Sequence, residues 1–506
     1  MAERQKIAVV GSGMAGLAAA WALHNDPSGK FDVTVYEKGN ACALDGYSYT
    51  PPGAKSSRID IPMRVFSGEY YANLFKLVAK FNVPTKPRRF LFVFTREEHD
   101  RPYFIHASNK HRIFPPNTTP NPSLYQRVRH LLLSIVLGLC YAVFAFGVKL
   151  FPPGVGGPGK AADTETIEHY CNRLYLPKFF LNDYLVLSSP VYITDYKKYT
   201  SGNDHNSVTT MQAMQEKLVS NNLRIKLRHP VTNIESQTDG TVKCTIVDLD
   251  NNKKERIETC AKVITATSSH ALAHLYKPAR PMASQLPICE AEVVVHTDYT
   301  IMSHVISRKG PLAKKPLSDL TAEEFLASTE WLNPDSTAAD ILALQTRRSP
   351  SGEEWTEATH VHSSGILVTV RPVIYSKNQT PGEAVYGSMN KTPRLPPAYV
   401  IADDKVAHKA VFYRMLSNPY RRELIRAAFS KEAPESGGGK ATGREGLLDG
   451  AAKTQGWRNG DGGVFCTGSW PCDSLTLLEN CVRTALNVAS TLGAEIPFDV
   501  VDRTEF

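Results

Sequence analysis

Several kinds of signal are missing from this sequence, and each absence argues against a class of protein. The nine cysteines include no Cys-x-x-Cys pair and follow no regular spacing, which argues against a zinc site and a disulfide framework. The HExxH pattern is also lacking, so no metal site is predicted. P-loop and Ser-His-Asp patterns are lacking as well. The net charge of +8 is spread along the chain without a basic tract interleaved with aromatics, so nucleic-acid binding is not expected.

A secretory signal is lacking as well. Residues 1–6 are few and polar, and an apolar strand pattern follows them at once. We therefore expect an intracellular protein in a reducing compartment, cytoplasmic or peripherally membrane-associated and not secreted. Its 506 residues exceed the usual size of one domain, so two domains are expected, and these can be interleaved.

The most specific pattern that is present lies in residues 7–38. An apolar run at 7–10 leads into Gly-Ser-Gly-Met-Ala-Gly at 11–16, and an Ala-rich stretch at 17–24 is typical of a helix. A second apolar run at 33–36 closes on Glu37. Strand, helix, second strand and terminal acid coincide, which favours a dinucleotide site over a βαβ unit without a ligand.

Each residue of this pattern has a physical role. Gly11 permits the tight turn, Gly13 lets the backbone approach a pyrophosphate, and Gly16 allows close packing of helix on strand. The free N–H groups at the helix start face the phosphates. Glu37 is placed to accept hydrogen bonds from a ribose 2′-OH, and its charge repels a 2′-phosphate, which favours FAD or NAD over NADP.

A long apolar stretch, residues 131–148, carries no charged side chain and is flanked by Arg127, Arg129 and Lys149. Its length and hydropathy are those of a membrane-spanning helix. A single crossing would, however, put the two ends of the nucleotide domain on opposite sides of the membrane. Two interpretations stay open: a helix buried in the substrate domain, or a helix or hairpin dipping into one leaflet.

The rest of the chain alternates between sheet and helix patterns. Residues 70–81 and 166–198 have helical spacing, 223–263 reads as a small antiparallel meander ending in a buried strand, and 90–94, 103–105, 290–302 and 362–375 read as further strands. Residues 308–356 are polar and predict an irregular region. Near the end, 463–470 predicts a strand entering a glycine turn, and 474–489 predicts a helix.

Three separated stretches resemble the FAD-dependent amine oxidase and phytoene desaturase superfamily. They are the βαβ unit, the pair RHPVTNIES and VITATSS, and the pair GGVFCTGSW and LLENCVRTALNVA. The pieces IDIPMRVF, LFKLVAKFNVPT and VVVHTDYTIM are similar to a narrower group, the predicted NAD/FAD-binding proteins found beside cyclopropane-fatty-acid synthases. The chain departs from the superfamily after Glu37, where KGNACALDG replaces the usual Gly-Gly-Arg turn.

The resemblance implies FAD as the cofactor and assigns residues to it. The pyrophosphate would be contacted by Gly11, Ser12, Gly13, Met14, Ala15 and Gly16, the adenosine end by Glu37, Lys38 and Val231, and the ribityl and pyrimidine end by Gly468, Ser469, Leu478 and Glu479. Residues 62–65 would run near the flavin ring. The positive end of the last helix would then stabilise charge on the reduced flavin.

Candidates for catalysis are fewer. His296 and Asp298 lie two residues apart on one strand and so face the same side, where the acid would raise the pKa of the imidazole. A structural pair is the alternative for them, as a structural ion pair is for Arg64, which could neutralise a substrate carboxylate or the flavin. Cys466 and Cys472 are interpreted as small buried core residues rather than redox groups.

We therefore predict an α/β protein with a GR2-like Rossmann FAD-binding domain built from discontinuous segments, 1–75, 221–275 and 455–506. A mixed α+β substrate domain, 76–220 and 276–454, is interleaved with it. The predicted activity is that of an FAD-dependent oxidoreductase removing a hydride from a C–N or C–C bond of a small hydrophobic, lipid-like or secondary-metabolite substrate. A redox-neutral fatty-acyl or polyene isomerase and a non-catalytic, membrane-associated flavin-binding protein are the alternatives.

Overall fold

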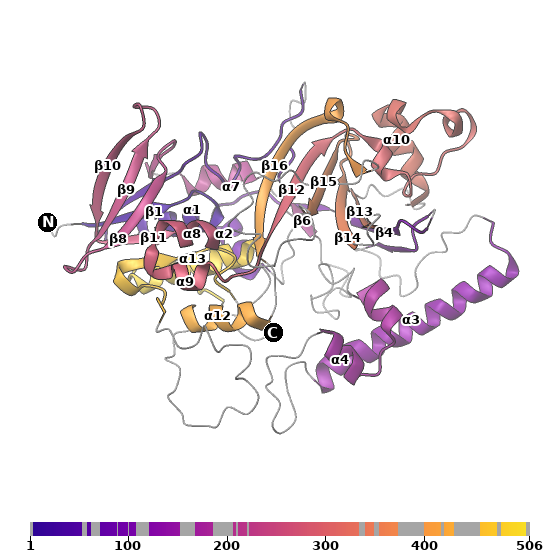
Figure 1. Cartoon of the computed structure of the whole chain (residues 1–506), viewed down its shortest axis with the longest axis horizontal. Helices are drawn as coiled ribbons and strands as arrows, with labels where there is room; N and C mark the ends of the chain where they lie inside the picture. The colour runs from indigo at the N-terminus through magenta and orange to yellow at the C-terminus, as the bar shows by residue number, and fades with distance from the viewer. Residues whose placement is uncertain are drawn as a thin grey trace. The chain divides into compact units, whose positions relative to one another are not determined.

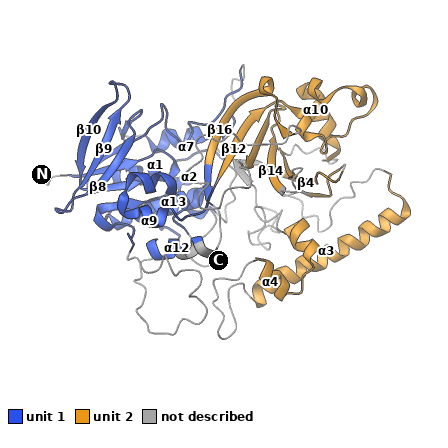
Figure 2. Cartoon of the chain, in the orientation of Figure 1, with its two compact units in different colours: residues 1–86, 208–289, 413–506 blue, residues 87–207, 290–412 orange. Residues whose placement is uncertain are grey.

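The chain folds into two compact units, each assembled from separated segments (Figures 1 and 2). The computed structural model describes residues 4–52, 58–61, 71–88, 90–99, 101–107, 121–151, 167–185, 206–208, 211–219, 222–332, 340–348, 354–372, 399–415, 419–429, 456–472 and 477–501. Unit 1 comprises 1–86, 208–289 and 413–506, and unit 2 comprises 87–207 and 290–412.

Unit 1 is built on a parallel sheet of five strands in the order β17-β11-β1-β2-β7. The strands are β1 (Gln5–Val10), β2 (Phe31–Tyr36), β7 (Arg224–Lys226), β11 (Lys262–Thr265) and β17 (Val464–Cys466). All four pairings are parallel. The runs of β-branched residues seen at 7–10 and 33–36 are explained by this position, because both faces of such a sheet are covered.

Each face of the sheet packs on its own layer. One face, with Ile7 and Val9, packs on α1 (Met14–His24), α2 (Ala72–Lys80), α7 (Met211–Leu218) and α13 (Leu478–Thr491). The other face, with Ala8 and Val10, packs on the antiparallel sheet of β8 (Val231–Ser236), β9 (Val242–Asp248) and β10 (Lys254–Cys260), and on α8 (Ser269–Leu275), α9 (Arg280–Ala283) and α12 (Pro419–Phe429). Short 3-10 turns, η4 (Lys277–Ala279) and η11 (Asp461–Gly463), complete the unit.

Unit 2 is built on a mixed sheet of seven strands in the order β16-β12-β15-β14-β13-β4-β5. The strands are β4 (Phe90–Arg96), β5 (Phe104–Ala107), β12 (Ile288–His296), β13 (Asp340–Arg348), β14 (Glu354–Val361), β15 (Leu367–Pro372) and β16 (Val406–Met415). β4 and β13 run parallel, although more than two hundred residues of sequence separate them. One core cluster of this sheet includes side chains of η5 (Tyr299–Met302), α10 (Ala322–Thr329) and η8 (Glu330–Leu332).

The remaining elements are short, with one exception. β3 (Lys86–Arg88) pairs with β6 (Asn206–Val208), and η6 (Gly310–Lys314), η7 (Leu317–Asp319) and η10 (Asp403–Lys405) are single 3-10 turns. The exception is α3 (Leu124–Leu150), whose N-terminus has a complete capping box formed by Ser123 and Gln126. α4 (Ile167–Arg173), α5 (Lys178–Phe180) and the π-helical turn η2 (Leu181–Leu185) follow it.

The α/β fold class predicted from the sequence is confirmed, and one expectation for a segment is wrong. Residues 308–356, expected to be irregular, contain α10 and the interior strand β13. Helix α12 lies in the stretch assigned to the substrate domain, yet its side chains belong to the core of unit 1. Along the chain, the boundaries between the observed units fall at 86/87, 207/208, 289/290 and 412/413. The sequence analysis placed them at 75/76, 220/221, 275/276 and 454/455.

Candidate dinucleotide site

The glycine-rich segment that follows β1 contains three glycines, and each of them has a different role. Gly11 has a φ of +102°, and a Cβ there would lie 2.7 Å from the carbonyl oxygen of Ala266. A Cβ on Gly16 would lie 1.9 Å from the carbonyl oxygen of Gly11, so this position tolerates no side chain. A Cβ on Gly13 would meet no described atom within 4 Å. The loop is therefore tight on its protein side and open at Gly13.

The open position coincides with the start of α1. Gly13 is the N-cap of this helix and supplies no side-chain hydrogen bond, and the first turn contains no acidic residue. The first N–H groups of a helix have no partner within the helix and favour an anion. Because β1 lies between β2 and β11, this turn is also the point where the order of the sheet reverses, which is where α/β folds bind ligands. The donors and the space fit a pyrophosphate.

Glu37, at the end of β2, is buried and holds the same loop. Its Oε2 accepts hydrogen bonds from the backbone N–H of Ser12 at 2.9 Å and from the Ser12 hydroxyl at 2.6 Å. Its Oε1 accepts from the N–H of Gly39 at 2.8 Å. Three of about four lone-pair positions are thus used within the protein, leaving one for the predicted ribose contact. Lys38 is exposed beside it.

Two further segments converge on this loop, as the resemblance implied. The N–H of Ala266, just after β11, donates to the carbonyl oxygen of Val10 at 2.8 Å. The indole N–H of Trp470, beyond β17, donates to the carbonyl oxygen of Thr267 at 2.9 Å. Residues 11–16, 265–268 and 467–470 therefore lie together at the carboxyl ends of β1, β11 and β17.

The turn after β17 is fixed by a residue that sequence reasoning missed. Thr484 of α13 accepts a hydrogen bond from the N–H of Gly468 at 3.0 Å, and its hydroxyl lies 2.9 Å from the carbonyl oxygen of the same glycine. Its hydroxyl also lies 2.8 Å from that of Thr467. Gly468 and the partly buried Ser469 are thereby held beside α13, while Val231 is the buried first residue of β8 in the same unit.

Glu479, at the start of α13, has a structural role in addition to its predicted contact with FAD. The Glu479 carboxylate accepts from the N–H and the amide of Asn73, at 3.0 and 2.6 Å, and from the N–H of Leu74 at 3.0 Å. Glu479 therefore caps α2. A contact of Leu478 and Glu479 with FAD stays a prediction that rests on their backbone N–H groups.

The two cysteines of this region are buried, as the sequence interpretation has it. Cys466 lies in β17, where burial raises the pKa of its thiol to about 12. A thiol with such a pKa stays protonated at neutral pH and is a poor nucleophile. Cys472 is also buried, and its carbonyl oxygen accepts a hydrogen bond from the buried Arg421 at 2.6 Å.

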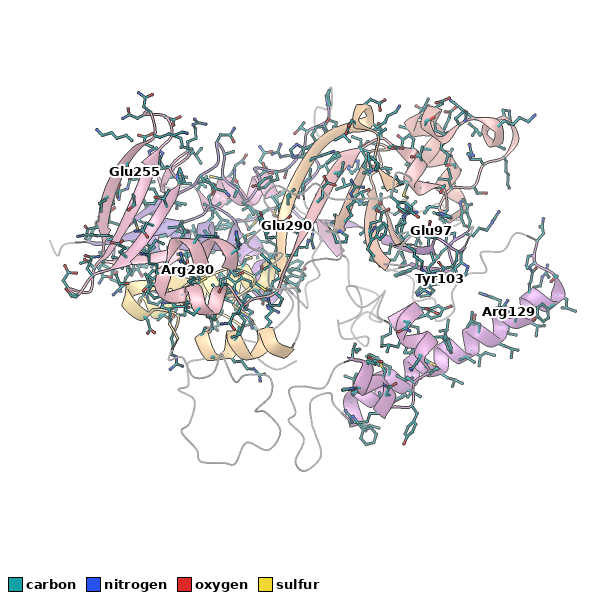
Figure 3. The ribbon with its side chains drawn as sticks, in the orientation of Figure 1. Glu97, Tyr103, Arg129, Glu255, Arg280 and Glu290 are labelled. Carbon is teal, nitrogen blue, oxygen red and sulfur yellow. The ribbon has the colours of Figure 1, made fainter. Side chains whose placement is uncertain are left out.

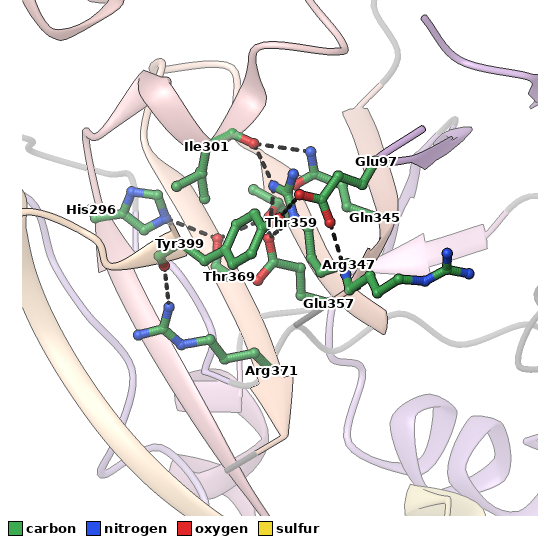
Figure 4. Close-up of polar contacts among 11 residues, drawn as sticks. Glu97, His296, Ile301, Gln345, Arg347, Glu357, Thr359, Thr369, Arg371 and Tyr399 are labelled. Carbon is green, nitrogen blue, oxygen red and sulfur yellow. Dashed lines mark hydrogen bonds and ion pairs between the residues drawn. The ribbon is translucent and has the colours of Figure 1, made fainter. Parts of the chain in front are cut away.

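The predicted catalytic pair lies in unit 2, where both side chains are buried. Figure 4 shows His296 beside Thr369. His296 Nε2 lies 2.8 Å from the Thr369 hydroxyl, and Nδ1 accepts from the N–H of Asp298 at 3.1 Å. The Asp298 carboxylate caps η5 by accepting from the N–H of Thr300 at 3.0 Å, and it also accepts from the N–H of Ala402 at 3.0 Å. Both side chains are therefore engaged within the protein.

Asp298 acts to raise the pKa of His296, as expected, but the net shift of that pKa is downward. Burial lowers that pKa to about 4, and Arg371 adds to the lowering, which together outweigh the opposing attraction of Asp298. His296 is then neutral at physiological pH, with one ring nitrogen accepting and the other donating. This geometry favours the structural interpretation of the pair. Arg64 and the predicted ring-contacting residues 62–65 lie outside the described residues.

The same sheet contains buried charges that sequence reasoning did not find. Arg347 forms a buried ion pair with Glu357 at 2.9 Å and donates to the carbonyl oxygen of Ile301 at 2.7 Å. Arg371 pairs with Glu292 at 2.8 Å on neighbouring strands. These pairs are cross-strand neighbours, which only the register of the sheet reveals.

Comparison with known proteins supports the assignment of the fold. A family model described as an NAD(P)-binding Rossmann-like domain matches residues 9–81. The crystal structure of a CLA-producing fatty acid isomerase from P. acnes matches 98% of this chain and 100% of its own, with a TM-score of 0.53 at 10% identity. Cyclohexylamine oxidase from Brevibacterium oxydans IH-35A matches over 97% and 98% of the two chains, with a TM-score of 0.47 at 14% identity. No curated protein matches the chain in sequence.

The chain thus contains a Rossmann-like dinucleotide-binding domain and shares an overall fold with the fatty acid isomerase, and this α/β fold agrees with the one that the resemblance implied. Its dinucleotide-binding domain is consistent with FAD as the cofactor. Among solved structures, the fatty acid isomerase shares this fold over almost the whole chain.

Proposed function

We propose that the protein is an FAD-dependent oxidoreductase that removes a hydride from a C–N or C–C bond of a small hydrophobic substrate, and that it works in the cytoplasm or at a membrane surface. The observation that carries the proposal is the open backbone position at Gly13, at the uncapped start of α1. A bound FAD would supply the hydride acceptor. The chain would hold it through the N–H groups of 13–16 on the pyrophosphate and Glu37 on the ribose.

The substrate class is proposed from two observations. The isomerase with the same fold acts on a fatty acid, as its name says. Unit 2 also carries the long apolar helix α3, most of whose apolar side chains are exposed. Both favour a lipid-like molecule over a polar metabolite.

A redox-neutral isomerase is the second candidate, and the same isomerase fold favours it. The two reactions differ in the fate of two electrons. In an oxidation the substrate loses a hydride and a proton, and an acceptor such as O₂ is reduced to H₂O₂. In an isomerisation the hydride returns to another carbon of the same molecule, so nothing is consumed.

The first test is the absorption spectrum of the purified protein, followed by release of the cofactor and its identification by chromatography. Flavin bands and free FAD support the proposal, and a colourless protein that does not bind added FAD contradicts it.

In the second test, fatty acids and amines are added to the protein without oxygen. Bleaching of the bands with H₂O₂ formation in air identifies an oxidase, whereas a rearranged double bond without oxygen uptake identifies an isomerase. A flavin that no substrate reduces, in a protein that binds vesicles, would point to the non-catalytic alternative.

A further inference from the structure

We propose that α3 lies in the plane of a lipid bilayer and is embedded in one leaflet. The helix is apolar on two opposite faces, of which only one packs on described protein. Ser134, Leu137, Cys140 and Gly147 are buried, and this face packs on the helical segment that follows it. Tyr141 contacts Phe180, Phe144 contacts Tyr170, and a Cβ on Gly147 would lie 2.5 Å from Leu174.

The opposite face is exposed and equally apolar. Its side chains recur at helical spacing, and their exposed fractions are 58% for Leu132, 44% for Ile135, 62% for Leu139, 44% for Val143 and 63% for Phe146. The most apolar window of α3 has a mean hydropathy of 2.5 and is 22% buried. A helix that is apolar all round is expected in a core or in a membrane, and this one is not in a core.

The pairing of strands decides how α3 can meet a bilayer. β4 precedes α3 in the chain and pairs with β13, which follows it. In unit 1, β1 precedes α3 and pairs with β11, which follows it. A single crossing would put paired strands on opposite sides of the membrane, and α3 is the one described helix that is long and apolar enough to cross. A helix that lies within one leaflet covers its exposed apolar face with lipid and keeps the paired strands on the same side of the membrane.

Charge favours lipid over a second copy of the chain. Arg127 and Arg129 lie near the start of α3 and Lys149 near its end, and residues 121–151 contain no acidic side chain (Arg129 in Figure 3). Two copies joined through α3 would bring basic ends onto basic ends in the parallel and in the antiparallel arrangement alike. Anionic headgroups complement the same charges.

The test is flotation of the full-length protein with vesicles of phosphatidylcholine, alone or mixed with phosphatidylglycerol. Binding needs no flavin and no turnover, so its failure is distinguishable from failure of the proposed function. We expect the protein to float with both, and more tightly with the anionic vesicles by about fivefold per engaged basic side chain. The variant Leu132→Gln/Ile135→Gln/Leu139→Gln/Val143→Gln should stay with the soluble fraction.

The matched control changes four apolar side chains that are exposed elsewhere, Tyr47→Gln/Ile257→Gln/Val400→Gln/Val411→Gln, and should float like the wild type. Flotation of the α3 variant at the wild-type level would overturn the proposal. So would a wild type that fails to float but forms a dimer which the α3 variant dissolves, because a second copy would then cover this face.

One added tryptophan at a time tests the orientation without a large loss of apolar surface, and its quenching is read as the difference from the wild type, whose five native tryptophans give the background. Leu132→Trp and Phe146→Trp lie at opposite ends of the exposed face. In vesicles with bromine at defined acyl depths, we expect both to be quenched most by shallow bromines. Unequal depths would indicate a crossing helix, and no quenching at either position would remove α3 from the membrane altogether.

Discussion

Gly13 is the N-cap of α1 and Gly16 lies in its first turn, and we expect a methyl group to impair FAD binding at the first position and folding at the second. We predict that Gly13→Ala folds with a stability change below about 1 kcal/mol, because its Cβ meets no described atom. The same Cβ would stand between the backbone and the pyrophosphate. FAD affinity should therefore fall about tenfold or more, which costs about 1.4 kcal/mol of binding free energy. Titration of the apo-protein with FAD measures it.

Gly16→Ala is the matched control. Its Cβ would lie 1.9 Å from a backbone oxygen, so the expected loss is in folding, about 3 kcal/mol, measured by denaturant unfolding without FAD. Equal FAD affinity of Gly13→Ala and the wild type would show that no phosphate lies over Gly13.

His296 provides a prediction about pH. Its folded pKa is about 4, below the unfolded value of 6.5, so between these values the unfolded state binds a proton that the folded state does not. Stability is therefore lost as the pH falls from about 6.5 towards 4, by about 2–3 kcal/mol at pH 4.5 from this residue. Urea unfolding of the wild type and of His296→Gln at several pH values measures the difference.

The glutamine variant should lose less stability than the wild type on acidification, whatever its stability at pH 7. Parallel pH curves for the two proteins would contradict the buried, neutral histidine. A change of the pH–rate profile without a change of the stability curve would instead restore the catalytic interpretation.

At the scale of elements, α2 depends on a side chain that belongs to another helix. Its first-turn N–H groups at Asn73 and Leu74 donate to Glu479 of α13, and its own N-cap residue, Tyr71, provides no side-chain cap. We predict that Glu479→Ala lowers the free energy of unfolding by about 2 kcal/mol, since buried N–H groups lose their acceptor. Glu255→Ala, at an exposed glutamate on β10, should change it by less than about 0.5 kcal/mol.

FAD titration of the same variant separates the two roles of Glu479. If FAD contacts only the backbone N–H groups at the start of α13, affinity should stay within about threefold once the apo-protein is folded. A much larger loss of affinity, with little loss of stability, would show that the carboxylate itself faces the cofactor.

The elements that the sequence predicted are those whose signal is local. β1, α1 and β2 follow from apolar runs and the glycines between them, and the strand and helix near the carboxyl terminus follow in the same way. β13 was missed because Gln345 and Arg347 read as polar loop residues. The Gln345 amide N–H donates to the carbonyl oxygen of Ile301 and Arg347 donates to Glu357, and only the folded sheet shows these partners, which lie in other elements.

In the site, too, only the residues with a local sequence signal could be predicted. The glycines and Glu37 carry a pattern with one physical explanation, so their convergence could be predicted. Thr484 and Asn73 carry no such pattern, because a threonine or an asparagine in a helix is usually an ordinary surface residue. For His296 the spacing predicted the side it faces, but the sign of its pKa shift depends on burial, which spacing does not give.

For the whole molecule, the division into two discontinuous units predicts where FAD acts on stability. All the described residues assigned to FAD belong to unit 1. A ligand at 100 times its Kd stabilises the state that binds it by about 2.7 kcal/mol, which slows exchange through the opening of that unit about 100-fold. We predict that FAD slows amide hydrogen exchange in β1, α1, β11 and α13.

In unit 2, the amides of β13, β14 and β15 exchange through a separate opening if that unit unfolds on its own, and their rates should then be unchanged by FAD. Equal slowing in both units would mean that the chain opens as one cooperative body, as expected if the repeated passage of the backbone between units couples them. Slowing in unit 2 alone would place the cofactor there and contradict the site at Gly13. The Gly13→Ala variant provides a further test. If FAD binds at the start of α1, this variant should lose the FAD-induced slowing of exchange in whichever unit the wild type shows it.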